Sequence, residues 1–242
     1  MKTETKRQPF ILEFIVGKKY FSTRAIKAEA TKRKLKYSAT TINQYLYNLR
    51  AQAKVFDAGR GWYSTLSKPF TQHTAPVEEL ATQLKGQFPF LQFSCWSTEQ
   101  VQGYAHHLIV QFTRFVYTAT DAMPSVAGFL KEINYHAHLN PLKGEIEKYF
   151  TPSAMTVVVR PSVSEEPVDG YYATAEKMLI DLFVEKDKLY LMDGAEYNRI
   201  FRNLALAHRI SIAQLLRYAD RRKVKTTFVK KVLEDSADAI RM

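Results

Sequence analysis

The chain has 242 residues, of which 46% are hydrophobic and 13% aromatic, so it is a globular rather than a disordered protein with room for two cores. Its formal net charge of +11 is carried by residues 1–68, which hold 15 Lys and Arg against 4 Asp and Glu; residues 69–242 hold 20 of each. This division predicts a basic first domain that contacts a polyanion and a neutral second domain with another task.

The chain has one cysteine, Cys95, which excludes an intramolecular disulfide and fits a reducing compartment. The charged first residues do not resemble a signal segment, and no stretch approaches the roughly 20 apolar residues of a membrane helix. We therefore expect a cytoplasmic protein that spans no membrane.

Three helices and a hairpin are predicted for the first domain. Apolar spacing indicates short helices over 10–15 and 23–34, the second capped by Ser22. Ser38 caps a third helix that runs to about residue 53, with a buried stripe formed by Ile42, Tyr45, Leu46 and Leu49. Residues 54–65 contain a Gly-Arg-Gly turn between two β-rich pieces, which predicts a hairpin. This order of elements is typical of a winged helix-turn-helix domain.

The other face of the third helix carries amide and hydroxyl side chains, which can read base edges in the major groove of double-stranded DNA. Arg60, at the hairpin tip, is placed to contact phosphates or the minor groove. The residues predicted to bind DNA are Ser38, Thr40, Thr41, Asn43, Gln44, Tyr47, Asn48, Arg50, Arg60 and Lys36. A solubilising basic tail, a winged helix used for protein contacts and an RNA-binding domain are the alternatives.

The fold class predicted is α+β, with a winged helix-turn-helix domain over 1–67, a linker over 68–76, and an α/β domain with a helical C-terminal subdomain over 77–242. The elements expected in the second domain are helices over 77–84, 99–110, 124–133, 175–184, 193–207, 211–220 and 225–234, strands over 88–96, 112–118 and 154–160, and an acidic loop over 161–170.

No catalytic, cofactor-binding or metal-binding constellation is predicted. The pairs His106-His107 and His136-x-His138 lack acidic or cysteine ligands at suitable spacing, and Cys95 has no neighbouring base. Glu176 and Lys177 resemble half of a nuclease site, but the strand over 155–160 contributes no acid to complete it. We instead expect structural roles for Glu176, Lys177 and Asp181, with Lys177 pairing with Asp181 one helical turn away.

The run Tyr172-Ala-Thr-Ala-Glu-Lys-Met-Leu-Ile-Asp-Leu-Phe183 resembles the Glu-Lys-containing signature of AbiEi-type transcriptional regulators, the antitoxins of type IV toxin–antitoxin pairs. Leu215-Leu-Arg-Tyr-Ala-Asp-Arg-Arg222 resembles a second segment of that family. Residues 93–101 depart from the family, because they lack its small, glycine-containing run. The resemblance implies a repressor that binds inverted repeats in its own promoter, as a homodimer, and neutralises a co-encoded toxin of the nucleotidyltransferase type.

Two other functions stay open at this point. A nuclease or other nucleic-acid enzyme would use the winged helix for targeting and would lose activity with Glu176. A protein-interaction adaptor of a defence system would have no DNA affinity at ordinary salt.

Overall fold

The computed structural model describes residues 7–109, 111–142 and 153–225, and these divide into two compact units. The first unit contains the chain up to Phe70 together with a later stretch, Leu204–Leu216, which we call the return segment. The second unit contains Thr71–Asn203 and Arg217–Lys225. The first boundary, between Phe70 and Thr71, lies within the predicted linker. The predicted second domain, 77–242, is one continuous stretch and so includes the return segment, which the structure groups with the first unit. In the described part of the chain, no helix is long and apolar enough to cross a membrane.

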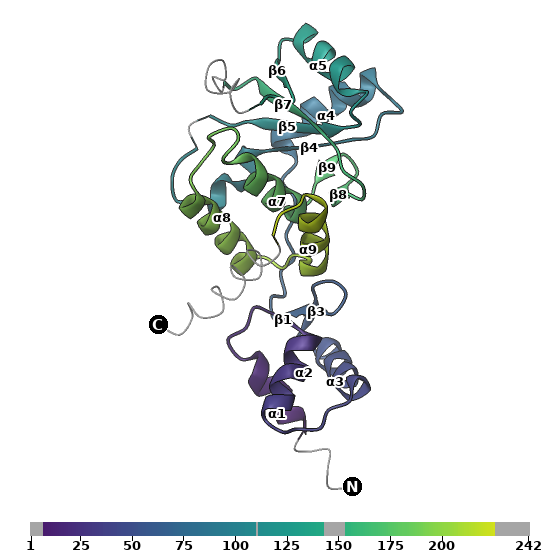
Figure 1. The fold of residues 1–242 in the computed structure, drawn as a ribbon, viewed down its shortest axis with the longest axis vertical. Helices are drawn as coiled ribbons and strands as arrows, with labels where there is room; N and C mark the ends of the chain where they lie inside the picture. The colour runs from purple at the N-terminus through teal and green to yellow at the C-terminus, as the bar shows by residue number, and fades with distance from the viewer. Residues whose placement is uncertain (1–6, 110, 143–152, 226–242) are drawn as a thin grey trace. The chain divides into compact units, whose positions relative to one another are not determined.

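The first unit has the element order α1 (Arg7–Ile15), β1 (Tyr20–Ser22), α2 (Thr23–Lys32), α3 (Ala39–Ala51), β2 (Phe56–Asp57) and β3 (Trp62–Ser64) (Figure 1). Its three short strands form an antiparallel sheet in the order β1-β3-β2. The three helices and the hairpin expected from the sequence are therefore present, and β1 adds a third strand to the hairpin.

The core of the first unit forms because each helix turns one apolar stripe inward. The stripe of α3 consists of Ile42, Leu46 and Leu49, all at most 2% exposed, while Tyr45 is only partly buried. These side chains form one cluster with residues of α1, α2 and β1, namely Phe10, Ile11, Ile15, Phe21, Ile26 and Ala30, and with Val55. This cluster covers one face of α3 and does not cover the opposite face.

The second unit is built on a six-stranded mixed sheet in the order β6-β7-β5-β4-β9-β8. The strands are β4 (Phe93–Ser97), β5 (Arg114–Thr118), β6 (His136–Leu139), β7 (Thr156–Pro161), β8 (Val168–Asp169) and β9 (Tyr172–Ala173). β7 runs parallel to both β5 and β6, and its central residues Val157–Val159 are fully buried. This burial explains the uninterrupted apolar run by which the sequence identifies the strand.

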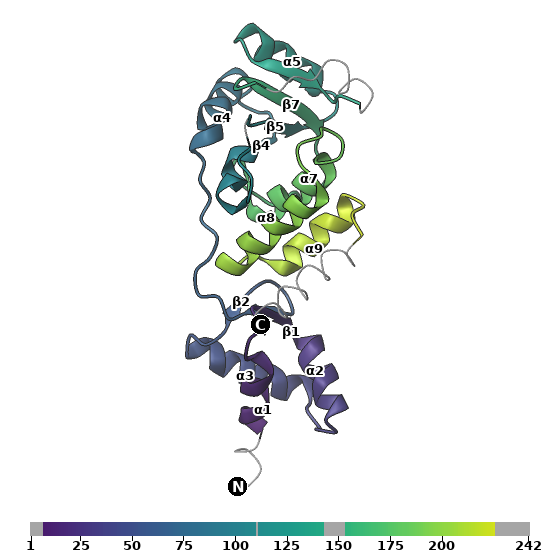
Figure 2. The same ribbon diagram turned by 90° about the vertical axis from the view of Figure 1, so that its left-hand side faces the viewer.

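Helices cover both faces of this sheet (Figures 1 and 2). α4 (Ala75–Gln87) and α5 (Met123–Glu132) pack on one face, where they form a cluster with Cys95, Val116, Val157 and Val159. α7 (Ala175–Glu185) lies on the other face. Because side chains alternate along a strand, Tyr117 and Arg160 point toward α7, away from the α4–α5 cluster.

Two more helices complete the described chain, α8 (Gly194–Ala207) and α9 (Ile212–Arg221). Both lie where the sequence predicts helices. The predicted helix over 225–234 falls almost entirely outside the described residues.

Three expectations for the second domain were wrong in detail. The strand predicted over 88–96 is β4 at Phe93–Ser97, because Phe88–Leu91 forms a turn that contains Pro89, a residue without an amide N–H. The helix predicted over 99–110 is a 3₁₀ helix, η1 (Thr98–Tyr104), and the amides of His106 and His107 bond to the Glu196 carboxylate instead of continuing it. The stretch 161–170, predicted to be a loop, contains the edge strand β8, which pairs with β9. The strands β6 and β9 were not predicted. The α+β class itself is confirmed.

Candidate nucleic-acid interface

The start of α3 is fixed by its two hydroxyl residues. Ser38 is the N-cap, and its Oγ accepts a hydrogen bond from the Thr41 amide at 3.0 Å and lies 2.8 Å from Thr41 Oγ1. The two hydroxyl groups that the sequence predicts to contact DNA are therefore already bonded within the helix start. Ser38 and Thr41 therefore serve first to start the helix.

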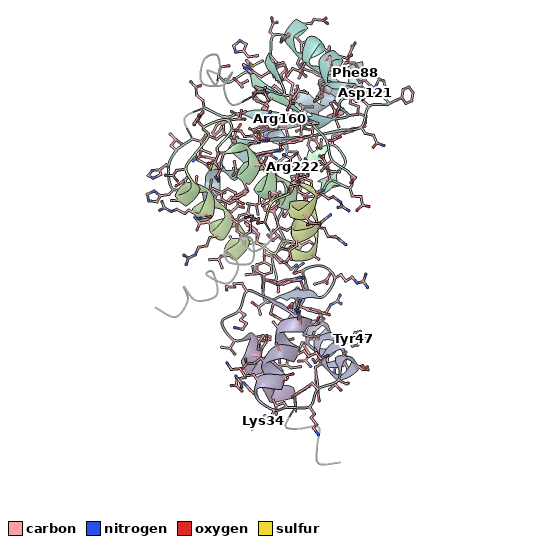
Figure 3. The ribbon with its side chains drawn as sticks, in the orientation of Figure 1. Lys34, Tyr47, Phe88, Asp121, Arg160 and Arg222 are labelled. Carbon is pink, nitrogen blue, oxygen red and sulfur yellow. The ribbon has the colours of Figure 1, made fainter. Side chains whose placement is uncertain are left out.

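The outward face of α3 consists of uncharged polar side chains, followed by an arginine. Thr40, Asn43, Gln44, Tyr47 and Arg50 are exposed, Tyr47 by 65%. Asn48 is half-buried, and its Oδ1 accepts a hydrogen bond from Gln44 Nε2 at 3.3 Å. Figure 3 labels Tyr47 on the surface of this helix. Spaced three or four residues apart, these side chains form one continuous surface on α3.

The connection between α2 and α3 supplies cations to this surface. Lys32, Lys34 and Lys36 are exposed, and no ion pair of theirs occurs among the described residues. Arg33 differs, because its guanidinium bonds Glu29 at 2.8 Å and Glu13 at 2.9 Å. The hydrogen bond from Arg33 lowers the pKa of Glu29.

One arginine thus engages two of the three acidic residues in 7–68, the third being Asp57. Lys34 and Lys36 are exposed and form no ion pair in the part of the chain that the structure describes, and exposed cations of this kind favour the binding of a polyanion.

The hairpin turn presents Arg60 in an exposed position. Its backbone is closed by hydrogen bonds from the Trp62 amide to Gly59 O at 2.8 Å and from the Ala58 amide to Trp62 O at 3.1 Å. Arg60 lines a hollow of about 790 Å³ together with Arg24 of α2 and with Lys18, which precedes β1. The sequence did not single out Arg24 or Lys18, and only their inclusion in the basic first 68 residues pointed to them.

The three residues assigned to structure, Glu176, Lys177 and Asp181, lie in the second unit on α7, and all three are buried. The Lys177 Nζ bonds Asp181 Oδ2 at 2.8 Å, so the predicted pairing one turn apart is confirmed. The same Nζ also bonds Tyr218 Oη at 2.9 Å and Glu166 Oε2 at 3.1 Å. It stands 3.6 Å from the centre of the Tyr117 ring, within cation–π distance.

A second set of buried charges continues from Asp181. Arg222 Nε lies 3.2 Å from Asp181 Oδ1 and its Nη2 lies 3.6 Å from Glu185 Oε1. Arg160 donates from Nη2 and Nε to Glu185 Oε2, at 2.6 and 3.2 Å. Burial by itself would lower the pKa of the Arg222 guanidinium, but the charge of Asp181 raises it. Figure 3 labels Arg160 and Arg222 in this unit.

We call this set the ionic network; it consists of Arg160, Glu166, Lys177, Asp181, Glu185, Tyr218 and Arg222. Three cations and three carboxylates balance, and each is at most about one-tenth exposed. Most of its members were missed from the sequence. A signal for them existed, because Lys177, Asp181 and Glu185 recur every four residues on one face of a helix.

Thr174 occupies the N-cap position of α7, but its side chain does not cap the backbone. Its Oγ1 instead donates to Glu176 Oε2 at 2.5 Å. Glu176 therefore satisfies a neighbouring hydroxyl at the helix start, where the helix dipole favours a carboxylate.

The remaining residues considered in the sequence are the two histidine pairs and Cys95. Within the described ranges, no group of three His, Cys, Asp or Glu side chains could hold a metal ion. His136 and His138 lie on the edge strand β6. Burial lowers the pKa of His138, and the charge of the nearby His136 lowers it further. Cys95 is completely buried, and burial raises the pKa of its thiol to about 12.

These two units, a helical unit with a small sheet and an α/β unit with a balanced ionic core, define the chain as a two-part α+β protein. The chain belongs to the family described as "Family of unknown function (DUF6577)", which it matches over residues 41–238. The match begins within α3 and extends through the second unit. Among curated proteins, none matches the chain.

Proposed function

We propose that the first unit is a winged helix-turn-helix domain that binds double-stranded DNA through α3. Three features support this proposal: the order of three helices and a hairpin, the β1-β3-β2 sheet, and the basic charge of this part of the chain. The observation that carries it is the exposed row of uncharged polar side chains on α3, bordered by lysines that form no ion pair with another described residue.

The roles of the predicted residues differ in this proposal. Asn43 and Gln44 are exposed amides that can each make two hydrogen bonds to adenine in the major groove. Lys34, Lys36 and Arg50 contact phosphates and set the position of the helix. Ser38 and Thr41 act through the helix start that they stabilise, because their hydroxyl groups already bond there.

The biological role we propose is that of an autoregulating transcriptional repressor in the cytoplasm, with two copies bound to inverted repeats in its own promoter. The resemblance of 172–183 and 215–222 to AbiEi-type regulators supports a more specific role as an antitoxin. In that role the second unit would neutralise a co-encoded toxin of the nucleotidyltransferase type.

Binding, rather than catalysis, is the function we propose for the whole chain. The acid and lysine that resemble a nuclease site, Glu176 and Lys177, are 7% and 0% exposed. The Lys177 ammonium is already bonded to two carboxylates and a tyrosine hydroxyl. A phosphodiester has no access to groups buried in this way.

The test is a salt titration of binding to the DNA upstream of the protein's own reading frame, beside a scrambled duplex of equal length. We expect tight binding to the upstream DNA, weaker binding to the scrambled duplex, and a steep loss of both with salt. Equal, weak binding to both duplexes would overturn the proposed repressor. Metal-dependent cleavage of plasmid DNA that Glu176→Ala removes would replace it with an enzyme.

A further inference from the structure

The turn of the β2–β3 hairpin lies against the return segment. Gly59 has φ +95°, and a Cβ atom added to it would stand 2.6 Å from Ala213 Cβ and 2.7 Å from Ser211 Oγ. The Ala213 amide also approaches Ala58 O at 3.4 Å. Glycine is therefore required at position 59 by its backbone conformation and by this close approach.

Tyr20, at the start of β1, fixes the same segment through its hydroxyl group. The Tyr20 Oη donates to His208 O at 2.7 Å and accepts from the Ile210 amide at 3.0 Å. Both backbone groups are thereby paired by one side chain of the small sheet. Tyr20 lies on β1, and β1 pairs with β3, the hairpin strand that follows the turn. The bonds of Tyr20 therefore connect the return segment to β3 through β1.

Arg209 makes the most extensive contacts of the return segment. Its amide bonds Lys68 O at 2.8 Å, and its carbonyl accepts from the Phe70 amide at 3.0 Å. Its guanidinium donates to Leu66 O and Ser67 O at 3.1 and 2.9 Å. The same guanidinium lies 4.8 Å from the centre of the Phe56 ring, on β2. Arg209 thus holds the chain on both sides of the hairpin.

We infer that the return segment is a positioning element of the nucleic-acid interface, and that it fixes the hairpin and so the place of Arg60. This inference rests on the proposed function, since it assigns the segment a role in DNA binding without DNA contact. It also means that the predicted domain over 1–67 does not by itself contain all the contacts that hold its hairpin in place. A sequence far from the hairpin then determines how firmly Arg60 is presented to a phosphate.

Two glycines of the turn provide a matched test in the full-length protein. Gly59 and Gly61 both have positive φ, +95° and +76°, so alanine strains the backbone at either position. Only Gly59 faces the return segment; the nearest atom to a Cβ at Gly61 is Thr23 Oγ1, 3.7 Å away. Gly59→Ala therefore separates the segment from the hairpin, whereas Gly61→Ala carries the strain alone.

Amide hydrogen exchange without DNA is the first measurement. We expect Gly59→Ala to speed exchange at the Arg209, Ile210 and Ala213 amides by about tenfold or more, and Gly61→Ala to leave them near wild type. Tyr20→Phe, which removes only one hydroxyl group, should speed exchange at Ile210 and at the hairpin amide of Trp62. This third variant decides the case if Gly59→Ala does not fold.

Binding to a duplex is the second measurement. Gly59→Ala and Tyr20→Phe should weaken binding about as much as Arg60→Ala, and neither should weaken Arg60→Ala further. Unchanged exchange in the return segment, or faster exchange with unchanged DNA affinity, would overturn the inference. Absence of DNA binding by the wild-type protein would instead remove the proposed function, and is recognised before any variant is compared.

Discussion

The two units use charged side chains in opposite ways. In the first unit, Lys34 and Lys36 are exposed before α3 and form no ion pair within the described ranges, next to a row of uncharged polar groups. In the second unit, three cations and three carboxylates are buried and paired with one another. Unpaired exposed cations keep their attraction for an external polyanion, whereas buried balanced ones have none to offer. The function that we propose for the first unit therefore depends on its surface, whereas the ionic network belongs to the interior of the second unit.

The largest effect we expect comes from removing one partner of the ionic network. Lys177→Met leaves the Asp181 and Glu166 carboxylates buried without their shared cation, which should lower the free energy of unfolding by about 3–5 kcal/mol. Urea denaturation measures this change. Lys188→Met, at an exposed lysine only three residues beyond Glu185, is the matched control and should change stability by less than about 0.5 kcal/mol. Similar values for both variants would show that the network is not a buried unit.

The next largest effect concerns the outward face of α3. Asn43→Ala or Gln44→Ala should reduce the discrimination between operator and random DNA by about 1–3 kcal/mol, because each removes a base-edge partner. Binding isotherms on both duplexes provide the value. Asn198→Ala, at an exposed amide on α8, should leave discrimination unchanged. If the α3 variants weakened every duplex alike, the groove assignment of this helix would be wrong.

A smaller effect is expected at the hairpin tip. Arg60→Ala should weaken operator and random DNA about equally, by roughly 1 kcal/mol, and reduce the slope of log affinity against log salt by about 0.9. A phosphate contact has these properties because it carries no base information. Arg202→Ala, an exposed arginine on α8, is the control for a general loss of positive charge. A loss confined to the operator would assign Arg60 to base reading instead.

Local patterns predicted the first unit well because its features are short-range. The buried stripe of α3, the Ser38 cap and the Gly59-Arg60-Gly61 turn all depend on neighbours within a few residues. The return segment could not be foreseen, since the bond between Tyr20 and His208 joins positions 188 residues apart. In the same way, spacing along α7 gave the Lys177–Asp181 pair, but not Arg160 or Arg222, which come from elsewhere in the chain.

The smallest effect tests burial in the second unit without any ionic partner. The Cys95 thiol is buried against the α4–α5 cluster and donates only weakly, to Tyr171 O at 3.4 Å, and burial raises its pKa to about 12 from an ordinary value of 9.0. Folding therefore holds the thiol protonated. The resulting stability is complete below pH 9 and is lost as the pH rises toward 12, since the unfolded chain releases the proton first.

Between pH 8 and pH 9.5, this linkage should cost wild-type protein about 0.8 kcal/mol more than Cys95→Val, as measured by urea denaturation at the two values. The valine variant has no thiol to titrate and keeps a similar volume in the cluster. An equal loss in both proteins would mean that water reaches the thiol in the folded state. The α4–α5 face of the sheet would then be less well packed than the face that holds the ionic network. In that case burial alone would not explain why the two units use their charged side chains in opposite ways.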